Sequence, residues 1–190
     1  MPTFDLQRLP PPLLSFVEGL VAEPFPGGLL LRSDRSSLLF EPVDDERIDA
    51  YEQRHGVVVP RRYRDFLRST NGATILDLAL FGLPPSMQQD PPQLSRDGFQ
   101  PLDLATANRF WRTAYEAAPD ALHIGSCTEG ETRLGDFLHE DGRVTRHAEG
   151  RSTTTEWPDL QAYLTAEIER MQGTGQAFAD LLADLEGYLE

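Results

Sequence analysis

The most regular hydrophobic pattern in the chain lies between residues 44 and 81, where two amphipathic segments precede an apolar run. In the first segment, residues recur at three- and four-residue steps, as on one face of a helix: Ile48, Tyr51 and His55. A carboxylate at Asp44 or Asp45 can cap the free N–H groups at the start, and Gly56 can adopt the left-handed conformation that ends a helix. The pattern predicts a helix between these two signals.

A second helix is predicted from Pro60, because a residue without an N–H is tolerated in the first turn. Its buried stripe consists of Tyr63, Phe66 and Leu67. Four arginines are expected to face water beside neighbouring acidic residues: Arg61, Arg62, Arg64 and Arg68. Asn71 and Gly72 both tolerate positive φ and are predicted to close the helix. The apolar run over residues 75–81 then predicts one strand covered on both faces.

Weaker patterns lie on both sides of this stretch. Residues 13–21 predict a short helix, and the apolar residues at 29–31 and 38–40 predict a hairpin. A further helix is expected over residues 104–114. Within it, Trp111 is assigned to the hydrophobic core rather than to a ligand platform.

The pattern from Leu122 onward predicts a C-terminal sheet. A hairpin is expected over residues 132–147, with its turn at Asp141-Gly142. The irregular apolar spacing over residues 134–137 indicates a bulge in the first strand of this hairpin.

Helical spacing returns after Pro158 and predicts a core helix that residues 173–175 break, because two of these three residues are glycine. A final helix is expected from Gln176. Eight acidic residues and one arginine lie between Glu156 and Glu190, so this end of the chain is both acidic and amphipathic. We expect it to dock on the body of the protein or on a partner.

Length, composition and net charge limit the kinds of protein that this sequence can encode. A chain of 190 residues most simply forms one domain. It has neither an apolar run long enough to cross a membrane nor a signal peptide at its start, which predicts a cytoplasmic protein. The net charge of −14 disfavours binding to nucleic acid or to an anionic membrane. It either favours a basic protein partner or serves solubility alone.

The sequence indicates no catalytic or metal site. His123 and Cys127 are four residues apart, with His139 and His147 downstream, but this spacing suits a helix and the segment reads as a strand. Cys127 also lacks the spacing of a nucleophile elbow. We therefore expect no enzyme activity, no metal and no cofactor.

The order of the residues in the central stretch resembles the SUKH superfamily. This resemblance rests on Ile48, Glu52, Gly56, Pro60, Tyr63, Phe66, Leu67, Asn71-Gly72 and a strand ending at Phe81-Gly82. It implies a single α+β domain with a mixed or mainly antiparallel sheet flanked by helices. The corresponding domain would span residues 44–172, preceded by an extension over 1–43 and followed by the acidic helix over 173–190.

SUKH proteins include bacterial immunity proteins against polymorphic toxins and a fungal cell-wall synthesis regulator. The resemblance therefore implies a non-enzymatic protein that occludes the active site of a toxin, and the net charge favours a toxin with a basic surface, such as a nuclease. The acidic residues expected to contact it are Glu129, Glu131, Asp136, Glu140 and Asp141. The alternative is a regulatory or scaffolding module with a partner unrelated to toxins.

Overall fold

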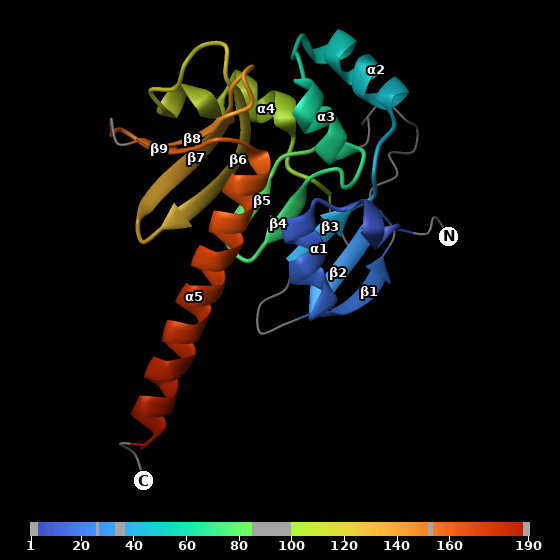
Figure 1. Cartoon of the computed structure of the whole chain (residues 1–190). Helices are drawn as coiled ribbons and strands as arrows, with labels where there is room; N and C mark the ends of the chain where they lie inside the picture. Colours follow the sequence, from blue (N-terminus) through green and yellow to red (C-terminus); the bar gives the residue numbers. More distant parts are fainter. Residues whose placement is uncertain (1–3, 26, 33–36, 85–99, 152–153, 188–190) are drawn as a thin grey trace.

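The computed structural model describes residues 4–25, 27–32, 37–84, 100–151 and 154–187. Its centre is a nine-stranded sheet in which every strand pairs with the next one along the chain, in the order β1 to β9. All eight pairings are antiparallel. The structure therefore confirms the predicted α+β class and shows an antiparallel sheet flanked by helices (Figure 1).

The strands are β1 (Val21–Phe25), β2 (Gly28–Arg32), β3 (Ser37–Phe40), β4 (Ala73–Ile75), β5 (Leu78–Leu80), β6 (Leu122–Glu129), β7 (Thr132–Leu138), β8 (Val144–Ala148) and β9 (Thr154–Trp157). The α-helices are α1 (Pro11–Glu18), α2 (Asp45–His55), α3 (Arg61–Leu67), α4 (Leu104–Arg109) and α5 (Leu160–Gly187). Two 3-10 turns, η1 (Leu6–Arg8) and η2 (Trp111–Ala114), complete the described elements. No helix among these is long and apolar enough to cross a membrane.

The predicted signals at both ends of α2 act as expected. The Asp44 side chain accepts a hydrogen bond from the Arg47 N–H at the start of α2, and Gly56 ends the helix with φ 66°. The Glu52 carboxylate accepts from the Val59 N–H at 2.6 Å and from the Arg64 guanidinium at 2.5 Å. Glu52 thus fastens the loop between the two helices to both of them.

Two polar side chains of the same stretch join α3 to the sheet. The buried Tyr63 hydroxyl lies 2.6 Å from the Phe81 carbonyl oxygen and 3.0 Å from that of Ile124. The Asn71 side chain accepts from the Leu83 N–H at 2.7 Å and donates to the Leu83 carbonyl at 2.8 Å. Asn71 therefore does not close α3, which ends at Leu67, but fixes the segment that follows β5.

The apolar run at residues 75–81 is not one strand, contrary to the sequence prediction. It is a hairpin in which Ile75 pairs with Leu78 across a two-residue turn. Leu76 occupies that turn with φ 53°, a conformation that glycine or asparagine usually adopts. Because neither residue stands there, the sequence carries no signal for the turn.

The N-terminal segment is part of the same sheet and core. Strands β2 and β3 form the predicted hairpin, and β3 pairs with β4. Strand β1 begins at Val21, the last residue of the predicted helix, and carries Pro24 at the edge of the sheet, where a missing N–H is tolerated. Leu13 and Leu31 are fully buried in the continuous core.

Successive residues of β7 face opposite sides of the sheet, and each side is covered by a different element. Asp136 contacts Tyr163 of α5, whereas Phe137 packs against Tyr115, the residue that follows η2. The predicted bulge lies in the neighbouring strand: the register shifts between His123 and Gly125 of β6. The Asp141-Gly142 turn is confirmed, with Gly142 at φ 95°.

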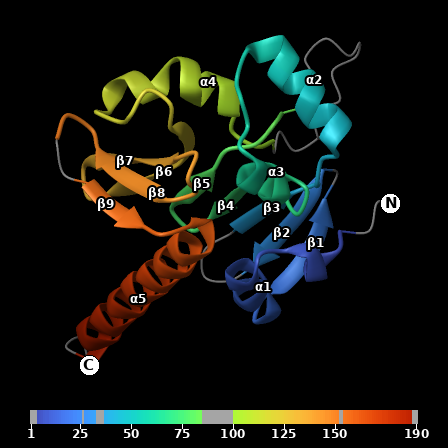
Figure 2. The ribbon, with the colours of Figure 1, turned by 45° about the horizontal axis from the view of Figure 1, so that its top comes forward.

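Helix α5 is continuous from Leu160 to Gly187, so the predicted break at residues 173–175 is wrong. A helix that is already formed on both sides can carry two glycines, each at a cost of about 1 kcal/mol. The first half of α5 packs on the sheet through Tyr163, Leu164, Ile168 and Met171. Both views show the second half extending away from the rest of the molecule (Figures 1 and 2).

Candidate protein-binding surface

Two exposed aromatic side chains, Phe110 and Trp111, lie at the junction of the helix α4 and the turn η2. Asp103 caps α4 by accepting hydrogen bonds from the N–H groups of Ala105 and Thr106. The Tyr51 hydroxyl of α2 bonds to the same carboxylate and accepts from the Ala105 N–H at 2.6 Å. This network fixes α4 against α2.

The predicted helix over residues 104–114 is not continuous, because α4 stops at Arg109 and is followed by η2. At this change of helix type, Phe110 and Trp111 are turned outward, with 60% and 39% of their surface exposed. The expectation that Trp111 belongs to the core therefore holds in part: its ring packs edge-on against the buried Phe81 at 5.5 Å between centroids, while the remainder faces solvent.

A hollow of about 510 Å³ lies between η2 and the sheet, and we refer to it as the His123 pocket. Its apolar and aromatic lining includes Leu102, Phe110, Trp111 and Tyr115. The strands β5 to β7 contribute polar and small residues, among them Ser126 and Thr128. Asp77, Arg133 and Glu149 are the charged residues of its lining.

His123 is the most enclosed ring beside this pocket. It stacks on Phe137 at 4.5 Å and meets Phe81 and Tyr115 edge-on at 5.1 and 5.4 Å. The Nδ1 atom lies 3.4 Å from the Ala107 carbonyl oxygen, whereas Nε2 is buried without a hydrogen-bond partner. Burial lowers the pKa of His123 to about 4, so the ring is neutral at pH 7.

Cys127 lies next to the same pocket but is not prepared for nucleophilic chemistry. Its thiol is buried, and burial raises its pKa to about 12, which keeps it protonated. His139 and His147 both contact the Thr145 hydroxyl, at 2.9 and 3.1 Å. Within the described residues, no three metal-binding side chains come together.

A second hollow, of about 640 Å³, adjoins the first on the other side of Phe110, and we call it the α2–α4 groove. It is lined by the end of α2, the loop after it and α4, including Val58, which is 80% exposed. Three arginines lie in this groove: Arg54, Arg109 and Arg112. The guanidinium of Arg109 rests over the Phe110 ring at 5.4 Å from its centroid.

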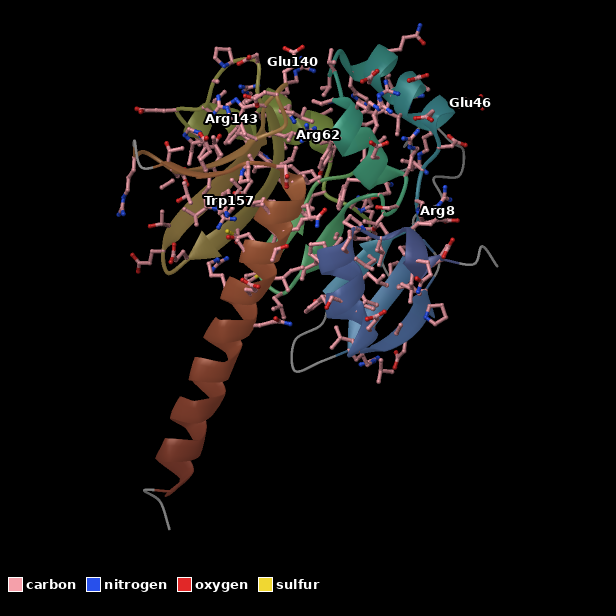
Figure 3. The ribbon with its side chains drawn as sticks, viewed as in Figure 1. Arg8, Glu46, Arg62, Glu140, Arg143 and Trp157 are labelled. Atoms are coloured by element: carbon pink, nitrogen blue, oxygen red, sulfur yellow. The ribbon has the colours of Figure 1, made fainter. Side chains whose placement is uncertain are left out.

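The structure does not bring the five predicted acidic residues together. Glu129 at the end of β6 and Glu131 in the turn that follows are exposed, next to Thr128 and Arg133 of the His123 pocket. Glu140 and Asp141 are exposed in the turn between β7 and β8, at the opposite end of β7 (Figure 3). Seven residues of strand separate the two turns, a length of about 20 Å.

Asp136 belongs to the interior, so its assignment to a partner-binding surface is wrong. Its carboxylate is fully buried and accepts hydrogen bonds from Arg146 Nε at 2.7 Å, from Arg146 Nη2 at 3.0 Å and from the Tyr163 hydroxyl at 2.7 Å. Arg146 in turn contacts Glu167 of α5 at 2.7 Å. This buried network joins the sheet to α5.

Comparison with family models gives a match over residues 42–166 to the SMI1 / KNR4 family (SUKH-1). The chain belongs to this family. The match confirms the resemblance deduced from the central stretch, and it begins two residues before the predicted domain boundary at residue 44. Strands β1 to β3 lie outside the match, although they belong to the same sheet.

A search of solved structures finds a protein from Pseudomonas syringae pv. tomato that is 15% identical to the chain, with a TM-score of 0.49. The alignment covers 78% of this chain and 92% of that one. A comparison with curated proteins gives no match. Glu52, Tyr63 and Asn71, which contribute to the resemblance, all bond to backbone atoms and so help to maintain the fold.

Proposed function

We propose that the chain is a non-enzymatic binding protein that neutralises a cognate toxin domain by covering its active site or substrate groove. The proposal follows from SUKH-1 membership, since this superfamily includes immunity proteins against polymorphic toxins. The observation that carries it is the gathering of exposed apolar side chains. Of the five large ones on the described surface, four line the two adjoining hollows: Val58, Leu102, Phe110 and Trp111. Exposed apolar patches of this kind are typical of protein-binding surfaces.

Charge indicates the class of partner. A net charge of −14 attracts a basic protein and accelerates its association, and a nuclease is the toxin whose active-site groove is most often basic. The proposed place of action is the cytoplasm, where such a toxin would meet its substrate. Under this proposal the chain acts by stoichiometric occlusion.

The test begins by capturing partners of the tagged chain from its own cell lysate at low and at high salt. A captured basic protein is then assayed with increasing amounts of the purified chain. We expect its activity to fall to the background at one equivalent. Persistence of the activity with the chain bound would contradict neutralisation and would favour the regulatory or scaffolding alternative.

A matched pair of variants tests whether the proposed surface is the one involved. Phe110→Ala removes an apolar side chain shared by both hollows, and Val21→Ala removes one that is 66% exposed on the edge strand β1. We expect Phe110→Ala to weaken binding of the captured protein about tenfold or more, as loss of an aromatic hot spot does, and Val21→Ala to leave it unchanged. Equal effects of the two substitutions on binding would show that this surface does not contact the captured protein.

A further inference from the structure

The His123 pocket combines three features that the fold itself does not require. Its open side is flanked by aromatic rings, its lining carries two carboxylates, and a buried ring nitrogen beside it has no hydrogen-bond partner. Each feature favours a ligand group of a particular charge or hydrogen-bonding capacity. Together they indicate the chemistry of one partner side chain.

The aromatic rings favour a cation. Trp111 packs on Phe81, and Tyr115 packs on His123 and on Phe137, so both rings are held in place by buried neighbours while they line the pocket. The face of an aromatic ring is negative and attracts ammonium and guanidinium groups. The two rings are therefore a fixed platform for a positively charged group.

The acidic residues in and beside the lining also favour a positively charged group. Glu149 contributes a carboxylate to the lining and Arg133 a guanidinium, while Asp77 contributes a second carboxylate that already has an interaction of its own. Burial, and next the nearby Glu149 carboxylate, raise the pKa of the Tyr115 phenol, so the hydroxyl stays neutral and can accept a hydrogen bond. Glu129 at the end of β6 and Glu131 in the adjoining turn add negative charge at this end of the sheet.

His123 supplies an acceptor. The contact of Nδ1 with the Ala107 carbonyl places the proton of the neutral ring on Nδ1, because a carbonyl oxygen can only accept. Nε2 then carries a lone pair, and it is buried beside Gly135 and Tyr115 without a donor.

We propose that the His123 pocket binds the guanidinium of one arginine from a basic protein partner, stacked on Trp111 and Tyr115 and paired with Glu149. Arginine fits better than lysine, because its planar group stacks on aromatic rings and presents several N–H donors at once. This assignment rests on the proposed function, since the neutralised toxin supplies the arginine. The assignment identifies an arginine side chain as the part of that toxin that the surface recognises.

The experiment uses the full chain and a small probe, N-acetyl-arginine amide, with the uncharged N-acetyl-citrulline amide as its counterpart. The sequence holds two tryptophans, so the ¹H–¹⁵N spectrum shows two indole N–H signals, and Trp111→Phe assigns them. We expect the arginine probe to shift the Trp111 signal in a saturable way at millimolar concentration. The citrulline probe should leave it in place.

Two single-carboxylate variants complete the test. Glu149→Gln removes a carboxylate of the pocket, and Glu140→Gln removes one at the far end of β7. We expect Glu149→Gln to weaken binding of the arginine probe about three- to tenfold, as loss of one nearby charge does, and Glu140→Gln to have no effect. The assignment is overturned if the arginine probe gives no saturable shift, if citrulline binds equally well, or if Glu149→Gln binds like the unmodified chain.

The probe experiment does not require the toxin, so the two proposals can fail separately. If the probe does not bind while the captured protein is still neutralised, the arginine assignment is wrong and the proposed function stands. If the probe binds but the captured protein keeps its activity, the pocket recognises arginine and the proposed function is wrong.

Discussion

At the scale of single residues, the side chains that make the sequence recognisable are those that satisfy backbone groups. Asp44 and Glu52 accept from N–H groups at helix ends, and Tyr63 and Asn71 bond to the segments around β5. The Asp44 cap was predictable because capping chemistry is local, whereas Tyr63 and Asn71 bond to residues that are distant in sequence. His123 was not predictable in this way, since its aromatic neighbours come from β5, β7 and the segment after η2.

The burial of neutral His123 has a consequence for stability. Its folded-state pKa of about 4 lies below the ordinary value of 6.5, so the unfolded chain binds more protons between these pH values. Stability is therefore lost as the pH falls from about 6.5 to about 4, by at most about 3 kcal/mol from this group. We expect His123→Asn to show a shallower decline over this range, measured by urea denaturation at several pH values.

The asparagine variant keeps a donor for the Ala107 carbonyl but has no titrating group at this position. Its lower stability at pH 7 does not affect the comparison, which concerns the slope of stability against pH. His139 and His147 also have lowered pKa values because of burial, and they leave a residual slope in both proteins. An unchanged slope in the variant would show that His123 does not govern the acid sensitivity.

At the scale of elements, the sequence predicted α2 and α3 because strong stop signals surround them. It did not predict the β4–β5 hairpin, because Leu76 adopts positive φ where a turn signal would normally contain glycine or asparagine. The opposite error occurred in α5, where Gly173 and Gly175 signalled an end that the helix does not have. In the hairpin the paired strands override the local preference of Leu76, and in α5 the helix on either side of the glycines carries them at a modest cost.

The attachment of α5 depends on the buried network of Asp136, Arg146, Tyr163 and Glu167. Arg146→Met would leave the fully buried carboxylate of Asp136 without a cation and would leave Glu167 paired with Arg170 alone. We expect a loss of about 3–5 kcal/mol in the free energy of unfolding at pH 7. The loss should shrink at pH 4, because the uncompensated Asp136 carboxyl group, whose pKa is raised by burial, then takes up a proton.

Arg143→Met is the matched control for this prediction. Arg143 pairs with Asp141 and Glu156 at the surface, where water already solvates the charges, so little change is expected. Urea denaturation of both variants measures the difference. Similar losses for Arg143→Met and Arg146→Met would show that burial does not decide the strength of these pairs.

At the scale of the whole molecule, the antiparallel order of the strands decides which surface residues lie close together. Glu129, Glu131, Glu140 and Asp141 lie within thirteen residues of one another in the sequence, which made them look like one cluster. A strand between two turns places those turns at opposite ends of the sheet, so neighbours in sequence become two separate acidic sites. Only the pair Glu129 and Glu131 adjoins the His123 pocket.

Because the two acidic pairs lie at opposite ends of β7, one experiment can separate the effect of net charge on binding from the effect of where the charge lies. The double variants Glu129→Gln/Glu131→Gln and Glu140→Gln/Asp141→Asn each remove two negative charges from the chain. If net charge alone attracts the basic partner, both should slow its association equally. If the surface around the His123 pocket makes the contact, the first variant should weaken binding about tenfold at low salt and less at high salt, whereas the second should have a small effect. Association and dissociation rates of the captured partner, measured at two salt concentrations, distinguish these cases. A larger effect of the second variant would move the interface to the β7–β8 turn.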